Sequence, residues 1–372
     1  MKIISIKLLP IRLNLKTPFT SAHETVSKRP LTIIEIQDEL GNKGLGELEA
    51  FNHPYYQSET QVTARWIIKN FLAPLLKNFT FNSPLTVAKK FRAVKGNMQA
   101  KAALDTALWD LYAKRQHKTL TQIISKKTGS NIKNLVPVGI SLGISNLKQT
   151  IKEVKQALNK NYRRIKIKIH GNFDLKRLQI IRNIFPTAPL MADANGSLKF
   201  TSKLVRQMDD LKFLMFEDPF PVEDIKENII LQNKLKTPLC LDEPITSAQK
   251  AVNAIYLGEG KIISMKTSCI GGLSSAIALI KAHQRFHFPL WCGGMLEGGV
   301  GRATNLALAS LDEFQFPGDI SETDRYYKND FTKTNFKLRD GCLLFPRNNL
   351  FGIGVLLKEK YIKKLKEVQT IL

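Results

Sequence analysis

From about residue 131 onwards, short apolar runs alternate with longer segments whose apolar positions recur every three or four residues. The run written RRIKIKIH shows the strand pattern most clearly, with isoleucines on one face and Lys166 and Lys168 on the other. Further runs continue the alternation, with strands expected at Arg164–Ile169, Leu190–Ala194 and Leu290–Gly293 and helices at Leu147–Asn159 and Leu175–Phe185. This order predicts repeated β-α units, with VPVGISLGI as the first strand.

The N-terminal third has a different pattern. Ile3–Leu15 and Leu31–Gln37 alternate as strands do, and the polar stretch Thr17–Arg29 between them predicts a long loop. Helical spacing then takes over in Thr60–Phe71, Pro84–Val94 and Ala100–Lys114. Strands followed by helices indicate an α+β unit.

The chain therefore divides into three parts, and its fold class is α/β. We expect residues 1–130 to form an α+β capping domain and residues 131–325 a modified TIM-type (β/α) barrel that catalyses a reaction. Residues 326–372 carry two short strand patterns, Phe336–Arg339 and Cys342–Phe345, and a basic helical one, Tyr361–Gln369. We expect this last segment to pack back on the cap.

Charged residues stand at the ends of successive strand-like runs, 25, 24, 25 and 24 positions apart: Lys168, Asp193, Glu217, Asp242 and Lys266. In a parallel barrel the ends of successive strands surround one mouth, so residues far apart in sequence become neighbours. A single acid at a strand end is more often a helix cap or a surface residue. Three in register would repel each other strongly unless a cation held them together.

The three acids supply oxygen ligands without His or Cys, which suits Mg²⁺, with Mn²⁺ as an alternative. Asp218 and Glu243 directly follow two of them, and strand alternation turns them away into supporting or capping positions. A cation beside a bound carboxylate would acidify the substrate's α-proton by stabilising an enediolate. Lys168 could then remove that proton, with the charge of Lys166 nearby lowering its pKa and Lys266 facing it.

Composition and charge limit the classes of molecule that the protein is expected to bind. The formal net charge is +24, which raises nucleic acid, anionic membranes or acidic small molecules as partners. The basic residues are spread along the chain, so a solvated lysine-rich surface is the simpler interpretation, with no nucleic acid or membrane partner expected. Four cysteines without a CxxC pattern indicate reduced thiols of a cytoplasmic protein. Interruptions near the N-terminus exclude a signal peptide, and no run has transmembrane length.

The combined motifs resemble the enolase superfamily, in particular its muconate-lactonising subgroup. The matching segments run through nearly the whole chain: GELEAF, ALWDLYAK, GISLGI, RIKIKI, MADAN, FEDPF, LDEPI, GGMLEGGVGRATNLALASL and PGDISETDRYY. The detail is similar to o-succinylbenzoate synthases related to N-succinylamino acid racemases. The resemblance implies Mg²⁺ on Asp193, Glu217 and Asp242, Lys168 as the acid/base, and Lys266 as a cation that stabilises the enediolate.

The implied reaction is the syn loss of water from 2-succinyl-6-hydroxy-2,4-cyclohexadiene-1-carboxylate, a dicarboxylate, in menaquinone biosynthesis. Racemisation of N-succinylamino acids or epimerisation of dipeptides with the same lysines remains an alternative, and a basic surface binder with a retained barrel is a remote one. Cys269 stands where many racemase-capable relatives carry arginine, which disfavours racemisation. The chain could assemble as a homo-oligomer. Candidate substrate-binding residues are Ser141, Asn195, Gly294, Met295 and Glu297.

Overall fold

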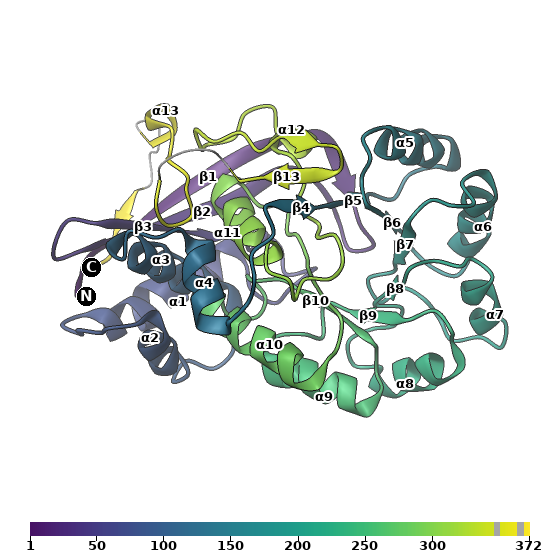
Figure 1. Ribbon diagram of the computed structural model, residues 1–372, viewed down its shortest axis with the longest axis horizontal. Coiled ribbons are helices and arrows are strands. Elements are labelled where there is room, and N and C mark those ends of the chain that lie inside the picture. The colour runs from purple at the N-terminus through teal and green to yellow at the C-terminus, as the bar shows by residue number, and fades with distance from the viewer. Residues whose placement is uncertain (346–349, 363–367) are drawn as a thin grey trace.

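The structure, a computed structural model, describes residues 1–345, 350–362 and 368–372. Antiparallel strands and the first helices lie at one end of the molecule, and a curled parallel sheet surrounded by helices lies at the other (Figure 1). The fold is thus an α/β fold with a parallel half-barrel and an N-terminal antiparallel sheet, which confirms the expected class.

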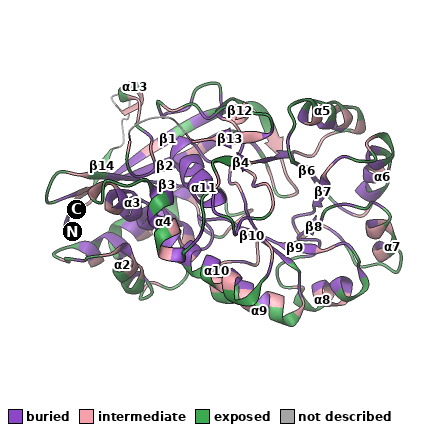
Figure 2. Cartoon of the chain, viewed as in Figure 1, coloured by how far each residue is buried: buried purple, intermediate pink, exposed green. Residues whose placement is uncertain are grey.

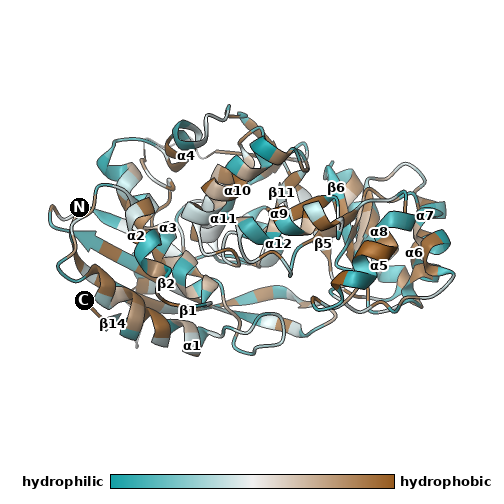
Figure 3. Cartoon of the chain, turned by 90° about the horizontal axis from the view of Figure 1, so that it is seen from below, coloured by the Kyte–Doolittle hydropathy of each residue, from teal (hydrophilic) through white to brown (hydrophobic). Residues whose placement is uncertain are grey.

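The antiparallel sheet has the order β14-β1-β2-β3 among the described residues. Its strands are β1 (Ile3–Thr20), β2 (Thr25–Asp38), β3 (Lys43–Leu48) and β14 (Gln369–Thr370). Bands of hydrophobic and hydrophilic residues alternate along the long β1–β2 hairpin (Figure 3), as expected for strands with one buried face. The accompanying helices are α1 (Gln61–Ile67), η1 (Ile68–Leu72), η2 (Ala73–Leu76), α2 (Pro84–Phe91), α3 (Met98–Arg115) and α4 (Leu120–Thr128).

The long loop predicted at Thr17–Arg29 is wrong, because most of this segment belongs to β1 and β2. The two strands stay paired, after a register shift between Asn14 and Phe19, as far as Thr20 opposite Thr25. The polar side chains suggested a loop, but strand pairing uses the backbone, and alternate side chains can face solvent. The hairpin therefore reaches the parallel sheet, where the Ile144 N–H donates to the Thr20 carbonyl.

The parallel sheet of the described residues has seven strands in the order β11-β10-β9-β8-β7-β6-β5. They are β5 (Gly139–Leu142), β6 (Arg164–Lys168), β7 (Leu190–Asp193), β8 (Phe216–Glu217), β9 (Leu239–Leu241), β10 (Ile262–Met265) and β11 (Leu290–Cys292). The helices after them are α5 (Leu147–Asn159), α6 (Asp174–Ile184), α7 (Leu204–Asp209), α8 (Ile225–Lys234), α9 (Ala248–Leu257), α10 (Leu273–Phe286) and α11 (Gly299–Ala309). The strands are buried, whereas the outer helices expose one face (Figure 2).

The gap between β11 and β5 is filled by the segment 314–319, which has no regular strand of its own. The Asp319 N–H donates to the Cys292 carbonyl at the end of β11 (2.9 Å). On the other side, the Gly139 N–H of β5 donates to the Gly318 carbonyl (2.8 Å). This irregular segment therefore occupies the place of an eighth strand.

The C-terminal strands reach two different sheets. β12 (Leu338–Arg339) and β13 (Cys342–Leu344) form a small antiparallel sheet with β4 (Leu135–Pro137), not with the N-terminal strands. Of these C-terminal strands, β14 instead pairs with β1. The helix expected at Tyr361–Gln369 falls largely on residues 363–367, outside the described residues; next to them lies α13 (Glu359–Ile362), and α12 (Thr323–Tyr326) precedes β12. None of the described helices has the length and apolar character needed to cross a membrane.

Helix α3 joins the two regions because it is buried on nearly every side. Gly44 and Gly46 of β3 lie directly against its backbone: a Cβ atom at Gly46 would overlap the Ala103 carbonyl oxygen. Towards the barrel, the Asp105 carboxylate accepts hydrogen bonds from the N–H and the hydroxyl of Ser274 (2.8 and 2.6 Å) at the start of α10. Burial raises the pKa of Asp105 to about 7.

Gly46→Ala should destabilise the protein by about 1–3 kcal/mol or more, because the added methyl group must push β3 away from α3. Urea unfolding would measure the change. Lys43→Ala, at the exposed start of the same strand, is the matched control and should cost less than about 1 kcal/mol. Equal unfolding midpoints for the two variants would contradict this packing argument.

Asp105→Asn should change how stability depends on pH. The folded chain keeps a proton on Asp105 up to about pH 7, whereas the unfolded chain releases it near the ordinary aspartate pKa of 3.8, so stability falls as pH rises between these values. The variant lacks this loss, so relative to wild type it should gain up to about 4 kcal/mol between pH 4 and pH 8. Urea unfolding at several pH values would test this, with exposed Asp340→Asn as the control; parallel pH profiles would refute it.

Candidate active site

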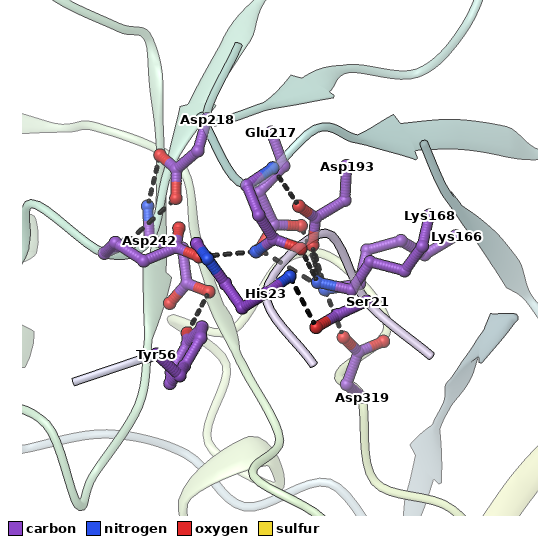
Figure 4. A network of polar contacts seen from close by, with 12 residues as sticks. Ser21, His23, Tyr56, Lys166, Lys168, Asp193, Glu217, Asp218, Asp242 and Asp319 are labelled. Carbon is purple, nitrogen blue, oxygen red and sulfur yellow. Dashed lines mark hydrogen bonds and ion pairs between the residues drawn. The ribbon is translucent and has the colours of Figure 1, made fainter. Parts of the chain in front are cut away.

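Strand register brings the predicted charged residues together at one end of the parallel sheet. Lys168 of β6 lies opposite Asp193 of β7, which in turn lies opposite Glu217 of β8. Asp242 and Lys266 directly follow β9 and β10. All five side chains are buried. Figure 4 shows Lys168, Asp193, Glu217 and Asp242 converging from neighbouring strands with Lys166 beside them.

The lysines are ion-paired with the carboxylates. The Lys168 Nζ lies 2.5 Å from an oxygen of Asp193, and the Lys166 Nζ lies 3.0 Å from Glu217 and 3.2 Å from Asp193. Lys266 forms an ion pair with Asp242. Three ammonium groups thus lie against the three acids that the spacing singled out.

Electrostatics at the mouth follow from this crowding. Burial, and then the neighbouring Asp193 carboxylate, raise the pKa of Glu217 well above its usual range. Burial also favours the acid form of Asp193, but the charges of Lys168 and Lys166 outweigh it and lower its pKa to about 2. Two carboxylates at adjacent strand ends therefore need positive charge to remain ionised together.

The donor set fits a divalent cation with oxygen ligands. The oxygens of Asp193, Glu217 and Asp242 pair with lysine ammonium groups, and the same negative oxygens would attract Mg²⁺ or Mn²⁺. Among the described residues, the acidic side chains whose oxygens lie within 4.8 Å of one another are Asp218, Asp242 and Glu243, and not the three predicted ligands together. Asp218, however, points its oxygens at the N–H groups of Asp242 and Glu243 (3.1 and 2.9 Å), so it supports the backbone and is a poor ligand.

Each lysine also has a partner outside these three acids. The Lys168 Nζ donates to the Asn195 Oδ1 (2.8 Å), and Lys266 donates to the Tyr56 hydroxyl. The Lys166 Nζ lies 2.7 Å from Asp319. These contacts orient the ammonium groups independently of the acids.

A cavity lies directly above this cluster, between the hairpin and the barrel. Of the predicted site residues, the following line it: Ser141, Lys166, Lys168, Lys266, Gly294, Met295 and Glu297. The three acids and Asn195 are not among the lining residues; Asn195 donates to Glu243 and accepts from Lys168. Ser141 has a buried hydroxyl without a hydrogen-bond partner among the described residues, so it is available to a ligand.

The N-terminal region supplies the other wall of the cavity, through Phe19, Ser21, Glu24, Phe51 and Tyr56. It also fixes the barrel's own loop. The fully buried Arg29 of β2 donates to the carbonyls of Met295 (2.9 Å) and Leu296 (3.3 Å).

Two residues at the site were missed as functional candidates. Nothing in the local sequence marks Tyr56 as a partner of Lys266, because the two residues are 210 positions apart. Asp319 follows Cys292, the end of β11, by 27 positions. Steps of 25 past Lys266 reach positions 291 and 316, so the spacing does not identify Asp319.

The chain belongs to the enolase superfamily. Residues 149–361 match the family described as enolase C-terminal domain-like, and residues 3–125 match the mandelate racemase/muconate lactonizing enzyme N-terminal domain. A solved structure from Enterococcus faecalis V583, described as an unknown member of that superfamily, superposes with a TM-score of 0.91 at 41% identity, covering 100% of both chains.

Among curated relatives, the o-succinylbenzoate synthase of Enterococcus faecalis is 40% identical and covers 100% of both chains. The N-succinylamino acid racemase of Thermus thermophilus is 34% identical, covering 98% of this chain and 97% of that protein. Both names suit a site with two lysines facing one cavity. The family is therefore established, and its relatives suggest two candidate reactions, o-succinylbenzoate synthesis and N-succinylamino acid racemisation.

A divalent cation should stabilise the folded chain, because the acids converge only when it is folded. Mg²⁺ or Mn²⁺ at 100 times its Kd should add about 2.7 kcal/mol to the free energy of unfolding. Glu217→Gln should remove most of this gain, which thermal unfolding would measure. Glu259→Gln, a buried residue hydrogen-bonded to Asn228 before β10, is the matched control and should keep it; equal losses in both variants would refute the site.

Proposed function

We propose that the protein is an o-succinylbenzoate synthase that removes water from 2-succinyl-6-hydroxy-2,4-cyclohexadiene-1-carboxylate in menaquinone biosynthesis, with Mg²⁺ as cofactor and Mn²⁺ as an alternative. The observation that carries the proposal is the placement of Lys168 and Lys266. They extend from the ends of β6 and β10 into one cavity, and the three acids of β7, β8 and β9 lie between them. Full-length relatives named for this activity support it.

The cation's ligands in this proposal are Asp193, Glu217 and Asp242, and when bound it would acidify the α-proton of the substrate carboxylate. Lys168 removes that proton from C1, with Asn195 orienting its Nζ. Lys266, held by Tyr56, stabilises the negative charge that develops on the carboxylate oxygens. The Lys168 ammonium then donates its proton to the hydroxide leaving C6 on the same face, which releases water and leaves the ring aromatic.

Lys166 lies two positions before Lys168 on β6 and is the third lysine of this site. Its own charge is well anchored. Burial acts against it, but Asp319, Glu217 and Asp193 together raise the pKa of Lys166 well above its usual range. Lys166 therefore serves as a permanent cation in this proposal.

The substrate's succinyl arm would lie in the cavity beyond the lysines. The free hydroxyl of Ser141 could donate to one of its oxygens. The loop of Gly294, Met295 and Glu297, which Arg29 fixes through its carbonyls, would bound the other side. We also propose a cytoplasmic location, supported by four cysteines that are all free thiols in the described chain.

Racemisation of an N-succinylamino acid is the second candidate, since it uses the same two lysines and a relative bears that name. It requires Lys266 to give and take a proton from the opposite face. Burial lowers the proton affinity of Lys266, but the Asp242 and Glu243 carboxylates outweigh it and raise its pKa. A lysine held as a cation suits charge stabilisation better than proton removal, which favours dehydration.

Lys168→Ala should lower Mg²⁺-dependent turnover of the cyclohexadiene acid by about 10²–10⁴-fold or more, because the proton carrier is lost. Product absorbance would measure the rate. Lys148→Ala, an exposed lysine of α5, is the matched control and should retain full activity.

A parallel incubation with an N-succinylamino acid in deuterated water separates the two candidates. The synthase assignment predicts rapid dehydration and little deuterium at the amino-acid α-carbon. Rapid deuterium uptake without dehydration of the cyclohexadiene acid would replace the first function with the second.

A further inference from the structure

Each of Lys166, Lys168 and Lys266 has a polar partner besides the acids at the ends of β7, β8 and β9. Among the described residues, Asp319 is the one charged residue of these additional partners. Asn195 and Tyr56 offer neutral oxygens to Lys168 and Lys266. The carboxylate of Asp319 instead lies 2.7 Å from the Lys166 Nζ.

The Asp319 carboxylate is held firmly in place. Its backbone N–H donates to the Cys292 carbonyl at the end of β11 (2.9 Å). Its second oxygen accepts from the Arg164 guanidinium (2.6 Å), which is buried and lies 4.2 Å above the Trp291 ring. The side chain is only 8% exposed, so Lys166 cannot draw it out of position.

Lys166 competes with a cation for the same oxygens. Its Nζ lies 3.0 Å from Glu217 and 3.2 Å from Asp193, both proposed cation ligands. An ammonium group and a divalent ion cannot occupy the same lone pairs, so cation binding requires Lys166 to give up these contacts. A buried lysine gives up such contacts at low cost only if another negative charge receives it.

We propose that Asp319 is a positioning residue that holds the Lys166 ammonium aside and thereby frees Glu217 and Asp193 for the divalent cation. The inference rests on the metal site of the proposed function and adds a determinant of cation affinity that is not itself a ligand. Arg164 serves the arrangement by fixing Asp319 from the opposite side.

Mn²⁺ affinity tests the proposal without any assay of turnover. The free Mn²⁺ signal in electron paramagnetic resonance gives the Kd for wild type, Asp319→Asn, Lys166→Met and the double variant. Asp319→Asn should raise the Kd by roughly 10–100-fold. Lys166→Met should bind Mn²⁺ at least as tightly as wild type, because the competing ammonium is gone. The double variant should match Lys166→Met within about twofold, since Asp319 acts through Lys166.

Two results would overturn the inference. An unchanged Kd for Asp319→Asn would show that Asp319 does not influence the site. The same weakening in the Lys166→Met background would show that Asp319 attracts the ion through its own charge. Asp193→Asn separates this from failure of the proposed function: if wild type binds no Mn²⁺, or this variant binds as well as wild type, the metal site itself is wrong.

Two more variants separate positioning from loss of folding. Asp319→Glu keeps the charge and should recover part of the Mn²⁺ affinity, which a purely structural defect would not allow. Asp110→Asn changes another buried acid that has a lysine partner. The Lys114 Nζ lies 2.7 Å from the Asp110 carboxylate, and both residues are on α3, outside the proposed active site. Asp110→Asn should lower the free energy of unfolding while leaving the Mn²⁺ Kd unchanged; a raised Kd there would remove the support that Asp319→Asn gives.

Discussion

The balance of buried charge at the barrel mouth constrains everything around it. Asp193, Glu217 and Asp242 are buried side by side, where like charges repel strongly and solvent cannot screen them. The lysines of β6 and the one after β10 supply the opposite charge. The strand register places Lys168, Asp193 and Glu217 opposite one another, and Asp242 and Lys266 follow the ends of β9 and β10. In the proposed function a cation and a proton-carrying lysine share this site because the sheet places the three acids between Lys168 and Lys266.

The surrounding structure separates chemistry from recognition. In the proposed mechanism the groups that move protons or hold charge stand at strand ends, whereas one wall of the cavity comes from the β1–β2 hairpin and the segment around Phe51 and Tyr56. Arg29 links the two, because it lies on the hairpin and fixes the carbonyls of the barrel loop at Met295 and Leu296. Substitutions in the hairpin can therefore change substrate choice while the reacting groups stay in place.

The regular part of the fold and the charged cluster could be predicted from the sequence because each β-α unit repeats with nearly constant length. The helix Leu147–Asn159 was predicted correctly to the residue, and the five spaced charges lie together as expected. The end of the hairpin, Thr17–Arg29, was predicted as a loop because its polar side chains give no sign of the backbone pairing. Asp319 was missed because Pro317 and Gly318 break any strand pattern, so its place beside Lys166 depends on long-range closure.

The irregular segment 314–319 has a consequence for how the protein is made. During synthesis the strands from β5 to β11 emerge before this segment, so the sheet stays open until the segment bridges β11 and β5. Strand β14 pairs later still, with β1 at the other end of the chain. The cavity is therefore among the last features to form. In a nascent chain that ends before Asp319, Lys166 and Arg164 lack the carboxylate with which both of them pair in the complete fold.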